Sequence, residues 1–307
     1  MLALSDKLSL EELEARLDAL FAPCGLCEVR CGAMRSQGQE GPCGLADEVH
    51  VYNRLLHMGE EAPLVPSLAV FLSGCSMRCS FCSEAEHLRP PFRAKAVSPQ
   101  RLAEQVAGDL ARAGREVRNI NFVGGEPSIA LPFLARFARA LAARVPSPPP
   151  LLLNTNGYLT PEALVLATHL CPIWVVDLKF GQDRCGREVG AVAQYSEVLR
   201  RNLSWLHDPG TAPPHEGVYA RPVQLWVRHL LMPGHLECCT KPCLDWLAAH
   251  APQARVNLMP AFHPFDGPGN ARWASLSAQE RDEGLALLRA SGLTRVWFDG
   301  RRLEASP

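Results

Sequence analysis

The sequence predicts an α/β fold, a partial (β/α)6 TIM-type barrel preceded by a small Cys-rich segment. From residue 67 onward, apolar strand patterns alternate with helical patterns, which is typical of βαβ units around a parallel sheet. Most of the unusual polar and Cys-rich turns fall at or near the C-terminal ends of these strands, where the loops of such a sheet converge. A flat doubly wound sheet is the alternative arrangement of the same units. We expect residues 1–66 to form the N-terminal segment and residues 67–307 to form the barrel.

The chain begins with an amphipathic helix that is predicted from Ser9 to Phe21. Leu10, Leu13 and Leu17 recur at helical spacing on one face, and Ser9 is a suitable N-terminal cap. This helix is expected to cover one side of the next element.

Four cysteines follow this helix, separated by glycines and other turn residues. They are Cys24, Cys27, Cys31 and Cys43. Four thiolates complete the ligand set of either a zinc ion or a closed 4Fe-4S cluster. The spacing does not separate the two metals, although we favour iron-sulfur. A group of reduced structural cysteines without metal is the third interpretation. We expect a metal here to pin the N-terminal segment to the barrel, because metal binding supplies folding free energy that a short Gly-rich segment lacks.

Six apolar runs are predicted as the parallel strands of the barrel: residues 68–72, 119–123, 151–154, 173–179, 223–231 and 255–259. Helices are predicted over residues 98–114, 192–207 and 277–290. Two further helices are predicted between the first two of these, one that ends near residue 143 and one that starts near residue 160. A short strand over residues 294–298 follows the last helix. The stretch from Asp208 to Glu216, rich in Pro, Gly and His, is predicted as a loop.

Composition limits the class of protein. The formal net charge of −1 gives no general attraction to nucleic acid or to a membrane surface. Twelve cysteines in a chain of 307 residues cluster mostly at metal-ligand spacings rather than forming a disulfide framework. There is no apolar run of about 18 residues and no N-terminal signal pattern. We therefore expect a cytoplasmic protein with reduced thiols and with no nucleic-acid or membrane partner.

Three further cysteines lie in the loop that follows the first barrel strand. Cys75, Cys79 and Cys82 are separated by three and then two residues, and Phe81 precedes the last of them. Three thiolates can hold three irons of a 4Fe-4S cluster and leave the fourth iron open for chemistry. A zinc knuckle or a structural cluster is the alternative. This motif resembles the signature of the radical S-adenosylmethionine (SAM) superfamily, in which the open iron binds SAM and the reduced cluster cleaves it to a 5'-deoxyadenosyl radical.

Later motifs extend this resemblance to the glycyl-radical-enzyme activases, typified by the pyruvate formate-lyase activating enzyme. Gly124, Gly125 and Glu126 match the motif that meets the methionyl amine in that family. The resemblance also assigns Asp177, Lys179 and Arg228 to the carboxylate and ribose of SAM, and the backbone of Phe81 to the adenine. An internal ion pair between Asp177 and Lys179 is the alternative. Asn154 stands where the family usually has Asp, so the resemblance assigns it no role.

The resemblance implies an enzyme that abstracts hydrogen from a protein glycine or from another substrate, a small molecule or a peptide. It also implies an electron donor such as flavodoxin or ferredoxin, and a glycyl radical enzyme or another protein or peptide as substrate. The Cys-rich leader before the radical motif departs from activases that carry extra cysteines after it, and is similar to a branch of activase-like iron-sulfur proteins. A non-catalytic iron-sulfur sensor and a zinc-binding scaffold are the alternatives from other classes.

Cys238, Cys239 and Cys243 follow the fifth barrel strand. Small apolar cysteines commonly pack the start of a helix, and we expect that role here. A thiol that reacts with the radical is the alternative. A third metal site is not expected, on the argument that adjacent cysteines cannot easily point at one metal.

Overall fold

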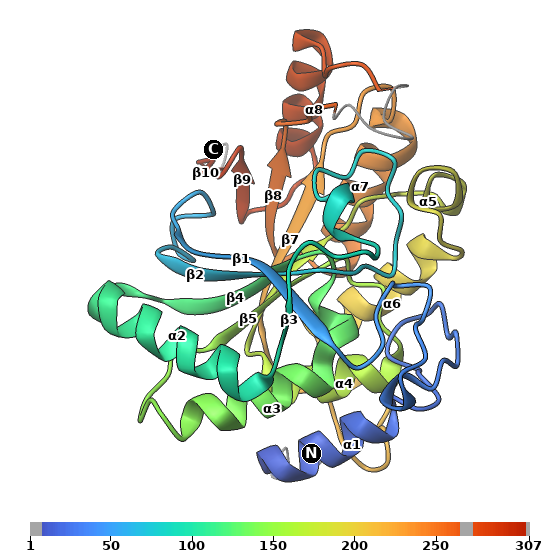
Figure 1. Ribbon diagram of the computed structural model, residues 1–307. Helices are drawn as coiled ribbons and strands as arrows, with labels where there is room; N and C mark the ends of the chain where they lie inside the picture. The colour runs from blue at the N-terminus through green and yellow to red at the C-terminus, as the bar shows by residue number, and fades with distance from the viewer. Residues whose placement is uncertain (1–7, 265–272, 305–307) are drawn as a thin grey trace.

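The computed structural model describes residues 8–264 and 273–304. Its centre is a ten-stranded sheet with the strand order β10-β9-β8-β7-β6-β5-β4-β2-β1-β3. The parallel strands are β2 (Ser67–Leu72), β4 (Asn119–Gly124), β5 (Leu151–Thr155), β6 (Ile173–Asp177), β7 (Gln224–Leu230), β8 (Arg255–Met259) and β9 (Val296–Phe298). The predicted parallel α/β sheet is confirmed, and its two edge strands leave the barrel open, as Figure 1 shows.

Antiparallel strands extend both edges of this sheet. They are β1 (Val49–His57), which pairs with β2, β3 (Ala96–Val97), which pairs with β1, and β10 (Arg301–Arg302), which pairs with β9. Strand β1 lies before residue 67 and β2 begins at residue 67, so the N-terminal segment contributes a strand to the same sheet. The division of the chain at this residue stays a prediction.

Helices connect the strands and cover the outer face of the sheet (Figure 1). They are α1 (Leu10–Ala19), α2 (Pro99–Ala113), α3 (Leu131–Ala142), α4 (Pro161–Leu170), α5 (Asp183–Gly190), α6 (Tyr195–His207), α7 (Lys241–His250) and α8 (Ala278–Ala290). Short 3-10 turns lie at Arg35–Gln37, Ala85–His87, Gly114–Glu116, Pro127–Ala130 and Pro209–Thr211, and one π turn lies at Leu236–Thr240.

The helix starts follow from capping chemistry. Ser9, Ser98 and Thr160 each accept a hydrogen bond from a backbone N–H in the first turn of α1, α2 and α4. At Ser9 the Glu12 side chain also accepts from the cap's backbone N–H, which completes a capping box. The three predicted starts are therefore confirmed.

Strand β6 and the segment after it differ from the prediction. The strand ends at Asp177, two residues before the predicted end, and α5 forms where the sequence suggested only a connection to the next helix. Helix α5 has only eight residues and holds two glycines, so it has a weak helical signal in the sequence. Over residues 8–264 and 273–304, none of the helices is long and apolar enough to cross a membrane.

Candidate active site

A pocket of about 380 Å³ lies where several parallel strands end, at the loops that follow β2, β4, β5 and β6. Its lining includes the three cysteines of the loop after β2 and six of the residues that the resemblance assigns to the cofactor. The latter are Phe81, Gly124, Gly125, Asp177, Lys179 and Arg228. This volume falls within the usual range of small-molecule sites. The structure therefore brings these residues together on one pocket, while their roles stay predictions.

The cysteine loop buries the Cys75 side chain and leaves those of Cys79 and Cys82 partly buried. The backbone N–H of Met77 donates to Cys75 Sγ at 3.4 Å, and the Asn156 amide lies 3.8 Å from the same sulfur. Burial raises the pKa of the Cys75 and Cys82 thiols and raises that of Cys79 to about 12. A bound metal deprotonates the thiols that coordinate it, which would offset this effect of burial. The donor set and its surroundings therefore fit a three-cysteine 4Fe-4S cluster.

Two glycines let the loop after β4 lie directly against the cysteine loop. A Cβ atom on Gly125 would lie 1.9 Å from the carbonyl oxygen of Gly74, and Gly124 has φ of +104°. The N–H of Gly125 donates to the Leu72 carbonyl at 2.7 Å, and that of Glu126 donates to the Gly74 carbonyl at 2.8 Å. These glycines thus serve the close packing of two loops in addition to lining the pocket.

The Glu126 carboxylate is absent from the pocket lining of the described residues. It is buried and accepts hydrogen bonds from Thr155 Oγ1 at 2.6 Å and from the Asn156 backbone N–H at 2.7 Å. Burial raises its pKa, although these hydrogen bonds oppose that shift. Its side chain therefore holds the turn after β5, which presents Asn156 to Cys75 and to Ser76 Oγ at 3.1 Å.

Asp177 and Lys179 form an ion pair of 2.6 Å at the edge of the pocket. Burial alone would lower the pKa of Lys179, but the nearby Asp177 carboxylate raises it, so the ammonium stays charged. Asp177 and Lys179 therefore line the predicted cofactor pocket and also form the internal ion pair that was the alternative.

Arg228 belongs to a set of buried polar groups that the sequence did not predict. Its Nε and Nη2 donate to the two Glu61 oxygens at 2.9 and 2.6 Å. Asn257 Nδ2 donates to the same carboxylate at 2.7 Å, and Glu60 lies 3.6 Å from the guanidinium. Because Glu61 lies in the loop after β1, far from Arg228 in sequence, no local pattern could have revealed the pair.

A second pocket continues into the barrel beside this one, and Arg228 and Asn154 line both. Among the described residues, Glu60 Oε2 and Asn121 Oδ1 are buried there without a hydrogen-bond partner.

The four N-terminal cysteines also converge. Cys24, Cys27, Cys31 and Cys43 line one small cavity that Ser76 of the cysteine loop also touches. A Cβ atom on Gly41 would lie 3.4 Å from both the Cys31 and the Cys43 sulfur. Burial raises the pKa of Cys24, and raises that of Cys27 to about 12. The donor set fits a closed four-cysteine metal site, and its metal stays a prediction.

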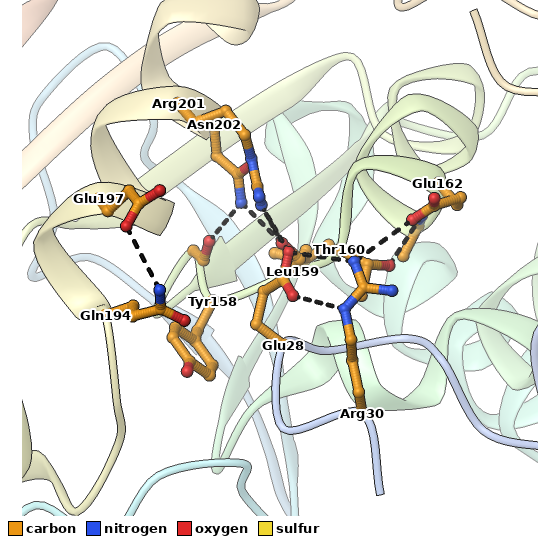
Figure 2. A network of polar contacts seen from close by, with 12 residues as sticks. Glu28, Arg30, Tyr158, Leu159, Thr160, Glu162, Gln194, Glu197, Arg201 and Asn202 are labelled. Carbon is orange, nitrogen blue, oxygen red and sulfur yellow. Dashed lines mark hydrogen bonds and ion pairs between the residues drawn. The ribbon is translucent and has the colours of Figure 1, made fainter. Parts of the chain in front are cut away.

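A polar network fastens this N-terminal segment to the barrel (Figure 2). Glu28 accepts from Arg30 Nε at 2.7 Å and from Arg201 Nη2 at 2.8 Å. Asn202 on α6 donates to the carbonyls of Gly157 and Leu159, both at 2.9 Å. The Glu28 N–H also donates to the Tyr158 carbonyl at 3.2 Å, so the N-terminal segment packs on the turn after β5.

The two cysteine groups are in direct backbone contact. The Cys75 N–H donates to the Cys43 carbonyl at 3.1 Å. Arg89 Nη1 donates to the Cys43 carbonyl at 3.3 Å and to the Cys75 carbonyl at 2.9 Å.

The expectation that Cys238 and Cys239 cannot point at one site is wrong. Their sulfur atoms lie 3.9 Å apart, and both face His235 Nδ1, at 3.3 and 3.8 Å. Both belong to the π turn after β7, where residues three and four positions after His235 share its face. Cys243 is buried in α7, as predicted for a packing residue.

Comparison with known proteins identifies the family. Residues 70–244 match the family model described as the radical SAM superfamily. An uncharacterized protein of Methanocaldococcus jannaschii is 30% identical over 249 residues, which are 80% of this chain and 67% of that protein.

Two crystal structures of SuiB from Streptococcus suis have a similar fold. The form bound to S-adenosylmethionine has a TM-score of 0.50 and 13% identity, and the match covers 73% of this chain and 47% of that chain. The form bound to the precursor peptide SuiA has a TM-score of 0.51 and 11% identity, and covers 73% and 46%. The chain thus spans about half the length of the structures that it matches. The family match over most of the barrel, together with the three-cysteine loop, shows that this chain belongs to the radical SAM superfamily.

Proposed function

We propose that this protein reductively cleaves SAM and uses the resulting radical to abstract hydrogen from a protein glycine, or from another protein or peptide substrate. The observation that carries the proposal is the single pocket shared by Cys75, Cys79, Cys82, Asp177 and Lys179. A three-cysteine iron-sulfur cluster with bound SAM would supply a 5'-deoxyadenosyl radical there. No polynucleotide or membrane partner is part of the proposal.

The chain's own residues would bind and shield the reacting groups. Cys75, Cys79 and Cys82 would hold the cluster, and the Lys179 ammonium would donate to the SAM carboxylate. Phe81 packs against Phe180, Phe262 and Trp273, with ring centroids 5.8 to 6.3 Å apart. Phe81 and Phe262 also line the pocket, so part of its wall is apolar and would keep solvent out of the site.

A protein or peptide substrate is favoured over a small molecule by one feature of the fold and one comparison. The barrel is open at its edge strands, and a second pocket beside the first leaves space for an extended substrate. SuiB, which shares the fold, has been crystallised with a precursor peptide. Glycine activation is the narrower form of the proposal and rests on the motif resemblance.

The test is anaerobic reconstitution with iron and sulfide, followed by dithionite and SAM. An enzyme should release 5'-deoxyadenosine, and release should rise when its substrate is added. With a candidate substrate carrying deuterated glycine, transfer of deuterium to deoxyadenosine would support glycine activation. A reduced cluster that forms no deoxyadenosine would instead indicate a sensor, and a colourless zinc protein would indicate a scaffold.

Lys179→Ala is expected to weaken SAM binding by about 1–3 kcal/mol, because a charge-assisted hydrogen bond to the carboxylate is lost. Isothermal titration calorimetry on the reconstituted protein measures the change. Lys241→Ala is the matched control, since Lys241 forms an exposed ion pair with Asp245 on α7. Equal affinity for SAM in the wild type, Lys179→Ala and Lys241→Ala would show that Lys179 serves only its ion pair with Asp177.

Cys24→Ala combined with Cys27→Ala is expected to remove the N-terminal metal and leave the radical cluster in place. We favour a second 4Fe-4S cluster, which could pass electrons from a donor such as flavodoxin or ferredoxin. Iron analysis should then fall from about eight to about four atoms per chain. An unchanged iron content near four in both proteins, with zinc lost from the variant, would assign zinc to the quartet.

A further inference from the structure

We propose that Cys185, His235, Cys238 and Cys239 bind a structural zinc ion, separate from both the radical site and the N-terminal quartet. Each residue offers one ligand atom, and these four atoms all lie within 4.8 Å of one another. Three thiolates and one imidazole are a common ligand set of closed, four-coordinate zinc sites.

The three distances among His235, Cys238 and Cys239 fit a tetrahedron around one ion, and Cys185 Sγ lies within 4.8 Å of each of these ligand atoms. Zinc–sulfur bonds of about 2.3 Å and zinc–nitrogen bonds of about 2.0–2.1 Å give tetrahedral edges of roughly 3.8 Å between sulfurs and 3.6 Å between sulfur and nitrogen. The Cys238 and Cys239 sulfurs are 3.9 Å apart, and they lie 3.3 and 3.8 Å from His235 Nδ1. A disulfide would need the two sulfurs at about 2.05 Å. Ligands of a cubane cluster bind different irons, which spaces them more widely than one ion does.

The local backbone explains how neighbouring cysteines share one ion. His235 precedes the π turn Leu236–Thr240, and its carbonyl accepts from the Cys239 N–H at 2.9 Å and from the Thr240 N–H at 3.3 Å. This turn places the residues three and four positions after His235 on its own face. π turns inside helices are rare and occur often at functional sites.

The fourth ligand comes from α5, and a glycine allows its approach. Cys185 is buried in the first turn of this helix. Before the helix, a Cβ atom on Gly181 would lie 2.8 Å from the Cys239 carbonyl and 2.9 Å from that of Cys238. A glycine there lets the chain after β6 lie directly on the π turn after β7. The ion would therefore join two segments that are about 50 positions apart in sequence.

The position of the site indicates what the zinc does. At the other end of α5, the carbonyls of Val189 and Gly190 accept from the N–H groups of Ser80 and Arg78 at 2.9 and 3.0 Å. His235 lies 5.5 Å from the Trp273 ring, and Trp273 Nε1 donates to Ser80 Oγ at 3.0 Å. The Cys185 side of the site thus contacts the loop that carries Cys79 and Cys82 through α5, and the His235 side contacts it through Trp273. The ion would therefore hold that loop in place.

The first experiment compares zinc content by mass spectrometry in anaerobically purified full-length proteins. Cys185→Ser and His235→Ala should each lose one zinc per chain relative to the wild type, with the N-terminal cysteines intact. Cys171→Ser is the matched control, because Cys171 is also buried but belongs to α4's C-terminal cap. Equal zinc content in all four proteins overturns the proposal. Because the result is a difference from the wild type, a zinc ion in the N-terminal quartet does not affect it.

The second experiment uses only the wild type, so it does not depend on the folding of a variant. Cys238 is partly exposed and should react with iodoacetamide if it is a free thiol. Peptide mapping should show Cys238 protected at first and at least tenfold more reactive after a zinc chelator is added. The same alkylation rate with and without chelator, or a Cys238–Cys239 disulfide in the anaerobic protein, overturns the proposal.

Discussion

Replacing Cys75, Cys79 and Cys82 together by alanine should reduce 5'-deoxyadenosine formation to the level of the assay without enzyme. The three thiols are the protein ligands that the proposed cluster has in this pocket, so the variant loses about four irons per chain and with them the reductive chemistry. Chromatographic detection of deoxyadenosine after addition of dithionite and SAM measures the effect. The metal at the N-terminal quartet should remain, because none of its ligands is changed.

Cys171→Ala provides the control for a buried cysteine outside the three metal-ligand groups. It should retain full iron content and full cleavage of SAM. If the triple variant still cleaves SAM, the proposed reaction does not take place at this loop.

Arg228→Met should destabilise the protein by about 3–5 kcal/mol, because it leaves a buried charge without its partner. Glu61 is fully buried, and Arg228 holds both of its oxygens. Adding Glu61→Gln to this variant should recover part of the loss, since the remaining amide carries no charge. Urea unfolding under anaerobic conditions gives the free energies. Arg101→Met, which removes an exposed ion pair with Glu104, should change stability by less than about 1 kcal/mol.

The pH dependence gives this prediction a second signature. Burial would raise the pKa of Glu61, but the hydrogen bonds and the charge of Arg228 hold that pKa below its usual value. The ion pair therefore stabilises the wild type above about pH 4.5, and this stabilisation is lost as the pH falls further. In Arg228→Met the burial remains and the pKa of Glu61 should rise. The variant should therefore regain stability relative to the wild type between pH 7 and pH 5. A constant difference across this range would mean that Glu61 is not the source of the destabilisation.

The sequence predicted the parts of the site that follow a strand directly. Cys75, Gly124 and Asp177 lie at or just after the ends of apolar runs, and parallel strands bring such ends together. The alternation of apolar runs and helix caps was enough to predict the parallel sheet. These features depend on neighbours in the chain, so a sequence displays them.

The contacts that were missed depend on residues far apart in the chain. Arg228 and Glu61 are separated by 167 positions, and no periodicity links them. Cys185 lies in a short helix with a weak helical signal, and it meets Cys238 only because Gly181 lets two loops touch. Cys238 and Cys239 face one point because of the π turn after β7, and the sequence carries no visible signal of that turn.

The hydrogen bond from Cys75 to Cys43 joins the backbones of the two cysteine groups, so a metal bound by one group would also restrain the other. Arg89 spans the same two carbonyls, so ordering one loop lowers the entropy that is lost when the other is ordered. Linkage then requires that filling either site raises the affinity of the other by the same factor.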